Sequence, residues 1–198
     1  MSDMTPAVGQ HAPDGPDGPD DATGTTRRLL LRVGSVLALF VAAGAAGGVL
    51  WERLWQAPTG LAYDGRWYLE PAGPDFSFEG IALFVLIAFP LGLVLAVLVG
   101  LWRGHETVTV VAVLVSAAVA AVVMYAVGSA LGPPDPQALA AGQPDYTPLP
   151  GDLGLTAPDR GRVRWHSTAL VVLPAGAMAG LVGSYLLGNW GFARRPRG

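Results

Sequence analysis

The sequence contains no cysteine and no lysine, and few of its residues carry a charge. The absence of cysteine excludes a disulfide framework and any metal site built from thiolates. Charged residues make up 14% of the chain, whereas a soluble domain averages about 25%. The net charge of -3 gives no basis for a nucleic-acid partner. A chain this poor in charge and 52% hydrophobic is typical of a membrane protein.

Long uncharged stretches dominate the rest of the sequence. Residues 80–101 contain no charged side chain, and roughly 20 apolar residues are enough for a helix to cross the hydrocarbon core. Three other stretches follow the same pattern. The sequence therefore predicts an all-α integral membrane protein, an antiparallel four-helix transmembrane bundle with a small extracytoplasmic β-hairpin in the first loop. The spans are expected at about residues 31–51, 79–102, 107–131 and 167–189, and the outer loops at 52–78 and 132–166.

Polar segments flank the four spans. Residues 1–26 include the repeat PDGPDGPDD, which has too few apolar side chains to build a core. We expect a disordered cytoplasmic tail over 1–26 and a four-span membrane domain over 27–192. A short basic cytoplasmic tail is expected over 193–198.

The arginines before the first span allow three interpretations. Arg27, Arg28 and Arg32 could anchor a retained first span, form the n-region of a cleaved signal peptide, or belong to a twin-arginine export signal. A retained span is favoured, since multi-span proteins rarely need a cleaved signal. Arginines also cluster at the C-terminal end of the chain. The positive-inside rule then predicts a multi-pass protein of the plasma (inner) membrane with both termini in the cytoplasm.

Small residues recur at four-residue spacing within the spans. This spacing places them on one helix face, where two backbones can approach closely. We therefore predict helix-to-helix packing at six glycines. These are Gly44, Gly48, Gly128, Gly132, Gly176 and Gly180.

The first outer loop contains a hairpin motif. Asp64 and Gly65 suit the two positive-φ positions of a type I′ turn, and aromatic and apolar residues flank them. Two strands alone are marginal in water, so we expect the hairpin on the membrane surface or against the second loop. A short helix is expected in that second loop near residues 136–141. The hairpin is either an aromatic lid over the bundle or a partner or ligand surface. The candidate surface residues are Tyr63, Arg66, Trp67, Tyr68 and Glu79.

Several residues near the spans have simple structural explanations. Trp51 and Trp55 are expected in an interfacial aromatic belt. Glu79 opens the second span, where the helix dipole stabilises an acidic side chain. Pro90 lies near the middle of that span and is expected to kink it, because proline removes a backbone hydrogen bond.

The span interiors contain no Asp, Glu, Arg or His. A charge at mid-bilayer costs about 2.5–3.5 kcal/mol on insertion scales and usually marks an ion or substrate path. Proton-coupled four-helix drug transporters need such a carboxylate. No nucleotide-binding or hydrolase motif occurs either, so no catalytic, cofactor-binding or metal site is expected. The loop carboxylates that leave an outer-surface enzyme as an alternative are Glu52, Asp75 and Glu79.

Short motifs near the span ends suggest a family. GGVLW ends the first span, FEG opens the second, LVGLWRGH closes it, and VVLPAGA enters the fourth. Together with the aromatic Asp-Gly loop, they resemble an actinobacterial family of four-span membrane proteins of unknown function. The resemblance covers roughly residues 27–191. It implies an inner-membrane location and brings neither an activity nor site residues.

These observations favour a non-catalytic accessory or scaffold protein of an envelope complex. Its expected partners are the lipid bilayer and either another membrane protein or a second copy of the chain. The alternative is a small transporter or channel subunit that moves an apolar or lipid-like solute past Pro90 and Pro174. A lipid-sized cavity between the spans would favour this alternative, and helices packed solidly at their glycines would oppose it.

Overall fold

A computed structural model describes residues 19–69, 74–101, 106–155 and 168–191. The chain divides into two units, Met1–Arg32 and Val33–Gly198. The described residues of the first unit form the beginning of helix α1 (Pro19–Leu54). The second unit holds the rest of α1 and the other described elements. Helix α1 therefore begins inside the segment expected to be a disordered tail, most of which lies outside the described residues.

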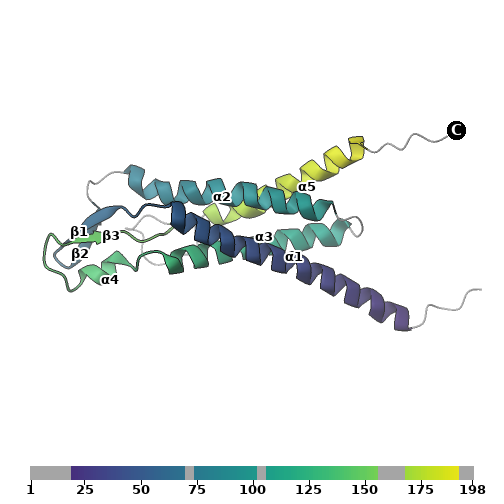
Figure 1. Cartoon of the computed structure of the whole chain (residues 1–198), viewed down its shortest axis with the longest axis horizontal. Coiled ribbons are helices and arrows are strands. Elements are labelled where there is room, and N and C mark those ends of the chain that lie inside the picture. Colours follow the sequence, from purple (N-terminus) through teal and green to yellow (C-terminus); the bar gives the residue numbers. More distant parts are fainter. Residues whose placement is uncertain (1–18, 70–73, 102–105, 156–167, 192–198) are drawn as a thin grey trace, which may run out of the picture. The chain divides into compact units, whose positions relative to one another are not determined.

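Long helices form most of the described chain (Figure 1). They are α1, α2 (Pro74–Gly100), α3 (Glu106–Leu131) and α5 (Val172–Gly191), the last preceded by the 3₁₀ turn η1 (Thr168–Val171). As the sequence predicts, four helices among the described residues are long and apolar enough to cross a membrane. Large aliphatic side chains such as Leu86, which is 70% exposed, cover their outer faces. Exposed apolar surface of this extent is typical of contact with lipid or with another protein.

Helices α1 and α3 pack closely through the glycines of α1. A Cβ atom at Gly44 would lie 2.6 Å from the carbonyl oxygen of Ala120, and one at Gly48 would lie 2.5 Å from that of Met124. Glycine therefore permits an approach that any larger residue would block. Residue numbers along this contact increase in the same direction on both helices, from Gly44 to Gly48 and from Ala120 to Met124. Helices α1 and α3 therefore run parallel.

Helices α2 and α5 form a second close contact. Gly176 and Gly180 of α5 lie against the carbonyl oxygens of Phe89 and Leu93, so that a Cβ at either glycine would overlap them. Gly92 of α2 lies in the same way against Leu173 of α5. Residue numbers along this contact also increase in the same direction on both helices, from Phe89 to Leu93 and from Gly176 to Gly180. Helices α2 and α5 therefore run parallel to each other.

Trp51 joins the two parallel pairs near the end of α1. Its side chain is 0% exposed, and its indole N–H donates a hydrogen bond of 2.8 Å to the carbonyl oxygen of Gly80, near the start of α2. Its ring meets Phe84 of α2 edge-on at 5.1 Å and Tyr125 of α3 at 6.4 Å. The end of α1 therefore lies beside the start of α2, so these helices run in opposite directions. Trp51, expected in an interfacial aromatic belt, has its side chain buried in the helix core.

The two prolines of the long helices occupy different settings. Pro90 lies inside α2, directly after Phe89, whose carbonyl oxygen contacts Gly176. Pro174 is within the first turn of α5, where its missing N–H removes no hydrogen bond within α5. Pro174 therefore leaves α5 uninterrupted.

The loop between α1 and α2 and the loop after α3 together build a small sheet. The predicted hairpin is confirmed: β1 (Thr59–Tyr63) and β2 (Arg66–Leu69) pair antiparallel, and Asp64 and Gly65 between them have φ values of 49° and 66°. A third strand, β3 (Pro148–Pro150), comes from the second loop and was not predicted. The sheet order is β2-β1-β3. We call these strands and helix α4 (Pro136–Ala140) the loop module.

The second loop also attaches the loop module to the helices. Helix α4, predicted from the sequence, is capped by Asp135, whose carboxylate accepts a hydrogen bond of 3.0 Å from the backbone N–H of Gln137. Past β3, Leu153 and Leu155 are each 3% exposed and pack into the core of the long helices. Within the second unit, Figure 1 shows the module at the end of the helices where α1 stops and α2 starts.

Candidate functional site

One face of the sheet is closed by α4. The cross-strand partners Ala62 and Trp67 are 1% and 5% exposed and pack with Ala140 of α4. The indole N–H of Trp67 donates a hydrogen bond of 3.1 Å to the carbonyl oxygen of Leu149. Gly60 lies against the indole, and a Cβ atom there would overlap the ring. Trp67, predicted as part of a partner surface, is instead buried and forms the core of the module.

The outer edge of β2 is closed by Gln137. Its side-chain oxygen accepts a hydrogen bond of 3.2 Å from the backbone N–H of Trp67, and its side-chain nitrogen donates one of 3.0 Å to the carbonyl of the same residue. The amide thus takes the place that a neighbouring strand would take. An open strand edge is a template for pairing with another chain, and Gln137 occupies this one.

The outer edge of β3 is blunted by prolines. Leu149 pairs with Gly60 of β1, and the backbone groups of successive residues point to alternate sides of a strand. Pro148 and Pro150 therefore occupy the outward positions, and proline has no N–H to donate. A partner strand would find no donor at these two positions.

A β-bulge leads into β3. The backbone N–H of Tyr146 donates to the carbonyl of Ala62 at 2.7 Å, and the N–H of Ala62 donates to the carbonyl of Thr147 at 2.9 Å. Two loop residues thus face one residue of β1. Tyr146 has a φ of 67°, in the position of the bulge that is usually glycine. For a residue with a Cβ, the left-handed conformation costs about 1–2 kcal/mol, and such outliers cluster at functional sites.

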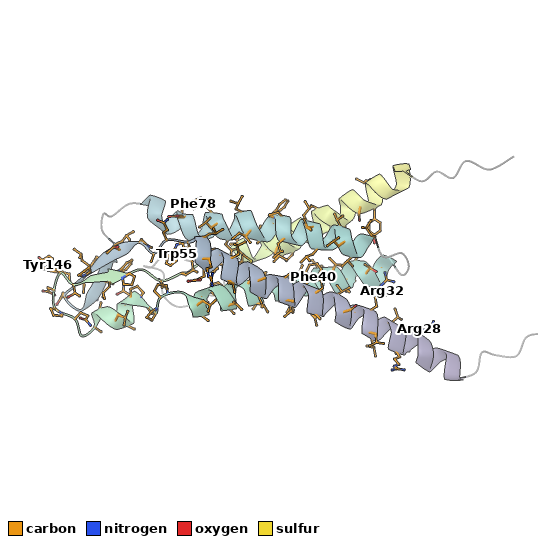
Figure 2. All side chains as sticks on the ribbon, viewed as in Figure 1. Arg28, Arg32, Phe40, Trp55, Phe78 and Tyr146 are labelled. Atoms are coloured by element: carbon orange, nitrogen blue, oxygen red, sulfur yellow. The ribbon has the colours of Figure 1, made fainter. Side chains whose placement is uncertain are left out.

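The other face of the sheet is exposed. Tyr63, Tyr68 and Tyr146 are 49%, 50% and 69% exposed, and the rings of Tyr63 and Tyr146 lie 5.6 Å apart. Arg66 is the cross-strand partner of Tyr63 and therefore shares its face. Figure 2 shows Tyr146 at the outer end of the module. We call this surface the open face; its residues are Leu61, Tyr63, Arg66, Tyr68, Tyr146, Pro148 and Pro150.

The acidic residues singled out in the sequence are not part of the open face. Glu79 is exposed on α2, and Glu52 belongs to α1. The side chain of Asp75 lies outside the described residues. In the described part of the chain, His, Asp and Glu side chains form no group of three that could hold a metal ion.

The predicted packing glycines fall into three groups. Gly44, Gly48, Gly176 and Gly180 line the two parallel contacts described above. Gly128 of α3 accommodates the indole of Trp51, which a Cβ atom would overlap. Gly132 faces the second loop, with a Cβ position 2.9 Å from that of Leu153. The glycines therefore position helices, a tryptophan and a loop.

An apolar groove runs between α1 and α3, away from the loop module. Its volume is about 420 Å³. Val111 and Val115 on its wall are 57% and 56% exposed, so the groove opens sideways. Its lining residues are Val33, Leu37, Thr107, Val108, Val111, Ala112, Val115 and Ser116.

Sequence reasoning missed two residues that shape the open face, Tyr146 and Gln137. The alternation of Pro148, Leu149 and Pro150 is a signal for an edge strand, and it could have placed Tyr146 beside the hairpin. The pairing of Gln137 with Trp67 depends on where α4 packs, and local sequence contains no sign of it.

Comparison with protein families, curated proteins and solved structures finds no match for the chain. Its function therefore has to be inferred from its own residues.

Proposed function

We propose that the chain is a multi-pass inner-membrane protein that acts as a non-catalytic accessory or scaffold subunit of an envelope complex. In this proposal the open face contacts a membrane-protein partner. The observation that carries the proposal is the exposure of Tyr63, Tyr68 and Tyr146 on a module whose opposite face is covered by α4. One of its strand edges is occupied by Gln137, and the other is blunted by prolines. Tyrosine is enriched at protein interfaces, since its ring buries a large area and its hydroxyl still forms hydrogen bonds.

Co-purification in a mild detergent tests this proposal. The wild-type chain is expected to bring down a partner in fixed stoichiometry. The double variant Tyr63→Ser/Tyr68→Ser is expected to lose it, since both side chains are half exposed and their replacement leaves the core intact. The control is Leu86→Ala, on the exposed surface of α2, which is expected to retain the partner. A chain that purifies alone, or a partner that stays with the double variant, would contradict the proposal.

We also propose that both termini are cytoplasmic and that the loop module lies outside. The four apolar helices and the arginines near the termini support this orientation, and membership in the actinobacterial four-span family remains part of the same proposal. The chain has no cysteine, so a single introduced thiol reports its own location. A membrane-impermeant maleimide is expected to label Asp64→Cys in intact cells and Ser2→Cys only after permeabilisation. The opposite pattern would reverse the orientation.

The groove between α1 and α3 favours a second candidate, a small transporter or channel subunit for a lipid-like solute. Its apolar walls and volume of about 420 Å³ suit an acyl chain. The variant Val111→Trp would fill the groove from its exposed side. If the second candidate is right, this variant transfers a fluorescent fatty acid between proteoliposomes more slowly than wild type. If the chain is a scaffold, the variant still co-purifies with the partner.

A further inference from the structure

The outer end of the open face combines aromatic rings with carboxylates. The rings of Tyr63 and Tyr146 lie 5.6 Å apart with an angle of 55° between their planes. Asp64 and Asp145 are their sequence neighbours, and a carboxylate oxygen of Asp145 accepts a hydrogen bond of 3.0 Å from the backbone N–H of Asp64. All four residues are exposed. We call them the tyrosine–aspartate tip.

This combination matches one kind of side chain. The face of a tyrosine ring attracts a cation within about 6 Å of its centre, and a carboxylate pairs with a guanidinium through two parallel hydrogen bonds. Arginine satisfies both groups at once, because its planar guanidinium stacks on rings and forks onto carboxylates. We propose that the tyrosine–aspartate tip receives an arginine side chain from an extramembrane segment of the partner protein.

The inference rests on the proposed function and adds how the partner is recognised. The outer edge of β2 is occupied by Gln137 and that of β3 carries Pro148 and Pro150. Addition of a partner strand is therefore disfavoured at both edges. Recognition then depends on side chains that approach the open face.

Arg66 is the charge on this face that opposes the proposal. It pairs across the strands with Tyr63 and is exposed. The carboxylates of Asp64 and Asp145 together with this guanidinium give charges of -1, -1 and +1, so the tip and Arg66 carry a net charge of -1. An incoming arginine is attracted overall, and removal of Arg66 is expected to strengthen its binding.

Fluorine NMR on the full chain tests the proposal. The five tyrosines of the chain are replaced by 3-fluorotyrosine, and the protein is held in dodecyl maltoside, which carries neither charge nor ammonium. The probe is a short capped peptide with two arginines, and its control has citrulline, a neutral isostere, at both positions. The arginine peptide is expected to shift the signals of Tyr63 and Tyr146 and to leave that of the buried Tyr125 in place. Salt is expected to weaken the effect.

Three variants separate recognition from folding. Tyr146→Gly removes one ring and places glycine at the positive φ that favours it, so the sheet is expected to persist while the peptide no longer binds. Asp145→Asn removes one charge but keeps an oxygen for the N–H of Asp64, and binding is expected to weaken about two- to fivefold. Arg66→Gln is expected to strengthen binding by a similar factor.

The outcomes distinguish this inference from the function on which it rests. Equal binding of the citrulline peptide, or undiminished arginine binding by Tyr146→Gly, would overturn the arginine site. A partner that co-purifies with Tyr146→Gly as well as with wild type would overturn it too, yet leave the scaffold function standing. Selective arginine binding that Tyr146→Gly abolishes would support the tip, even if no partner were found in detergent.

Discussion

Replacement of Gly128 by alanine is expected to weaken the helix core by forcing a methyl group against the indole of Trp51. A Cβ atom at this position would overlap Cε3 of that ring, would lie 2.9 Å from Cζ3, and would lie 3.1 Å from the carbonyl oxygen of Gly48. The indole cannot retreat freely, because its N–H is bonded to Gly80 at 2.8 Å and Phe84 lies edge-on at 5.1 Å. Either α1 moves away from α3 or the indole loses its hydrogen bond.

The expected change in the free energy of unfolding of Gly128→Ala is the sum of three contributions. Overpacking a filled core costs about 1–3 kcal/mol, and loss of the indole hydrogen bond would add about 1 kcal/mol. Alanine gains about 1 kcal/mol over glycine in helix propensity. We therefore expect Gly128→Ala to lower the free energy of unfolding by about 2 kcal/mol. Reversible unfolding in mixed micelles of dodecyl maltoside and dodecyl sulfate, followed by tryptophan fluorescence, measures this difference.

Gly183 of α5 provides the matched control. A Cβ atom there would meet nothing within 4 Å, so Gly183→Ala is expected to keep the propensity gain and to be neutral or slightly stabilising. If both alanine variants unfold alike, the account of Gly128 is refuted. The double variant with Trp51→Phe adds a second check, since a smaller ring should reduce the effect of Gly128→Ala below about 1 kcal/mol.

Three further predictions concern other contacts. Gly176→Ala is expected to lower stability by about 1–3 kcal/mol, because the methyl group would overlap the carbonyl of Phe89; the same unfolding assay measures it, and an unchanged midpoint would contradict it. Gln137→Ala is expected to expose the edge of β2 and to speed hydrogen exchange at the N–H of Trp67, whereas exchange as slow as in wild type would refute this role. Tyr146→Gly is expected to be about 1 kcal/mol more stable than Tyr146→Ala, since both lose the ring and alanine alone keeps the left-handed strain; equal stabilities would show that the positive φ carries no strain.

The parts predicted well from sequence depend on local chemistry. Four uncharged stretches of helical length indicate four apolar helices, and the Asp64-Gly65 pair indicates the hairpin. Both signals are local, because span length depends on composition and a type I′ turn depends on two neighbouring residues. The short helix α4 follows from a similar cue, an acidic cap followed by Pro136 at the first helical position.

The misplaced tryptophans show where local reasoning stops. Trp51 and Trp67 both occur where an aromatic side chain could lie at a surface, yet both are buried. Each is placed by glycines distant in sequence or across a strand, Gly128 for the first and Gly60 for the second. Such pairings are tertiary, and hydropathy along the chain does not contain them. The candidate site changes accordingly, with Trp67 supporting the open face from beneath.

The glycine contacts join helices that run in the same direction, α1 with α3 and α2 with α5. Parallel helices align their dipoles unfavourably, so their close approach has to be offset by packing between backbones. Glycine permits that packing, as the contacts of Gly44 with Ala120 and of Gly176 with Phe89 show. At these contacts no room is left for a solute, and the apolar groove lies instead on an exposed flank of α1 and α3. This arrangement favours a rigid support for the loop module over a path through the helices.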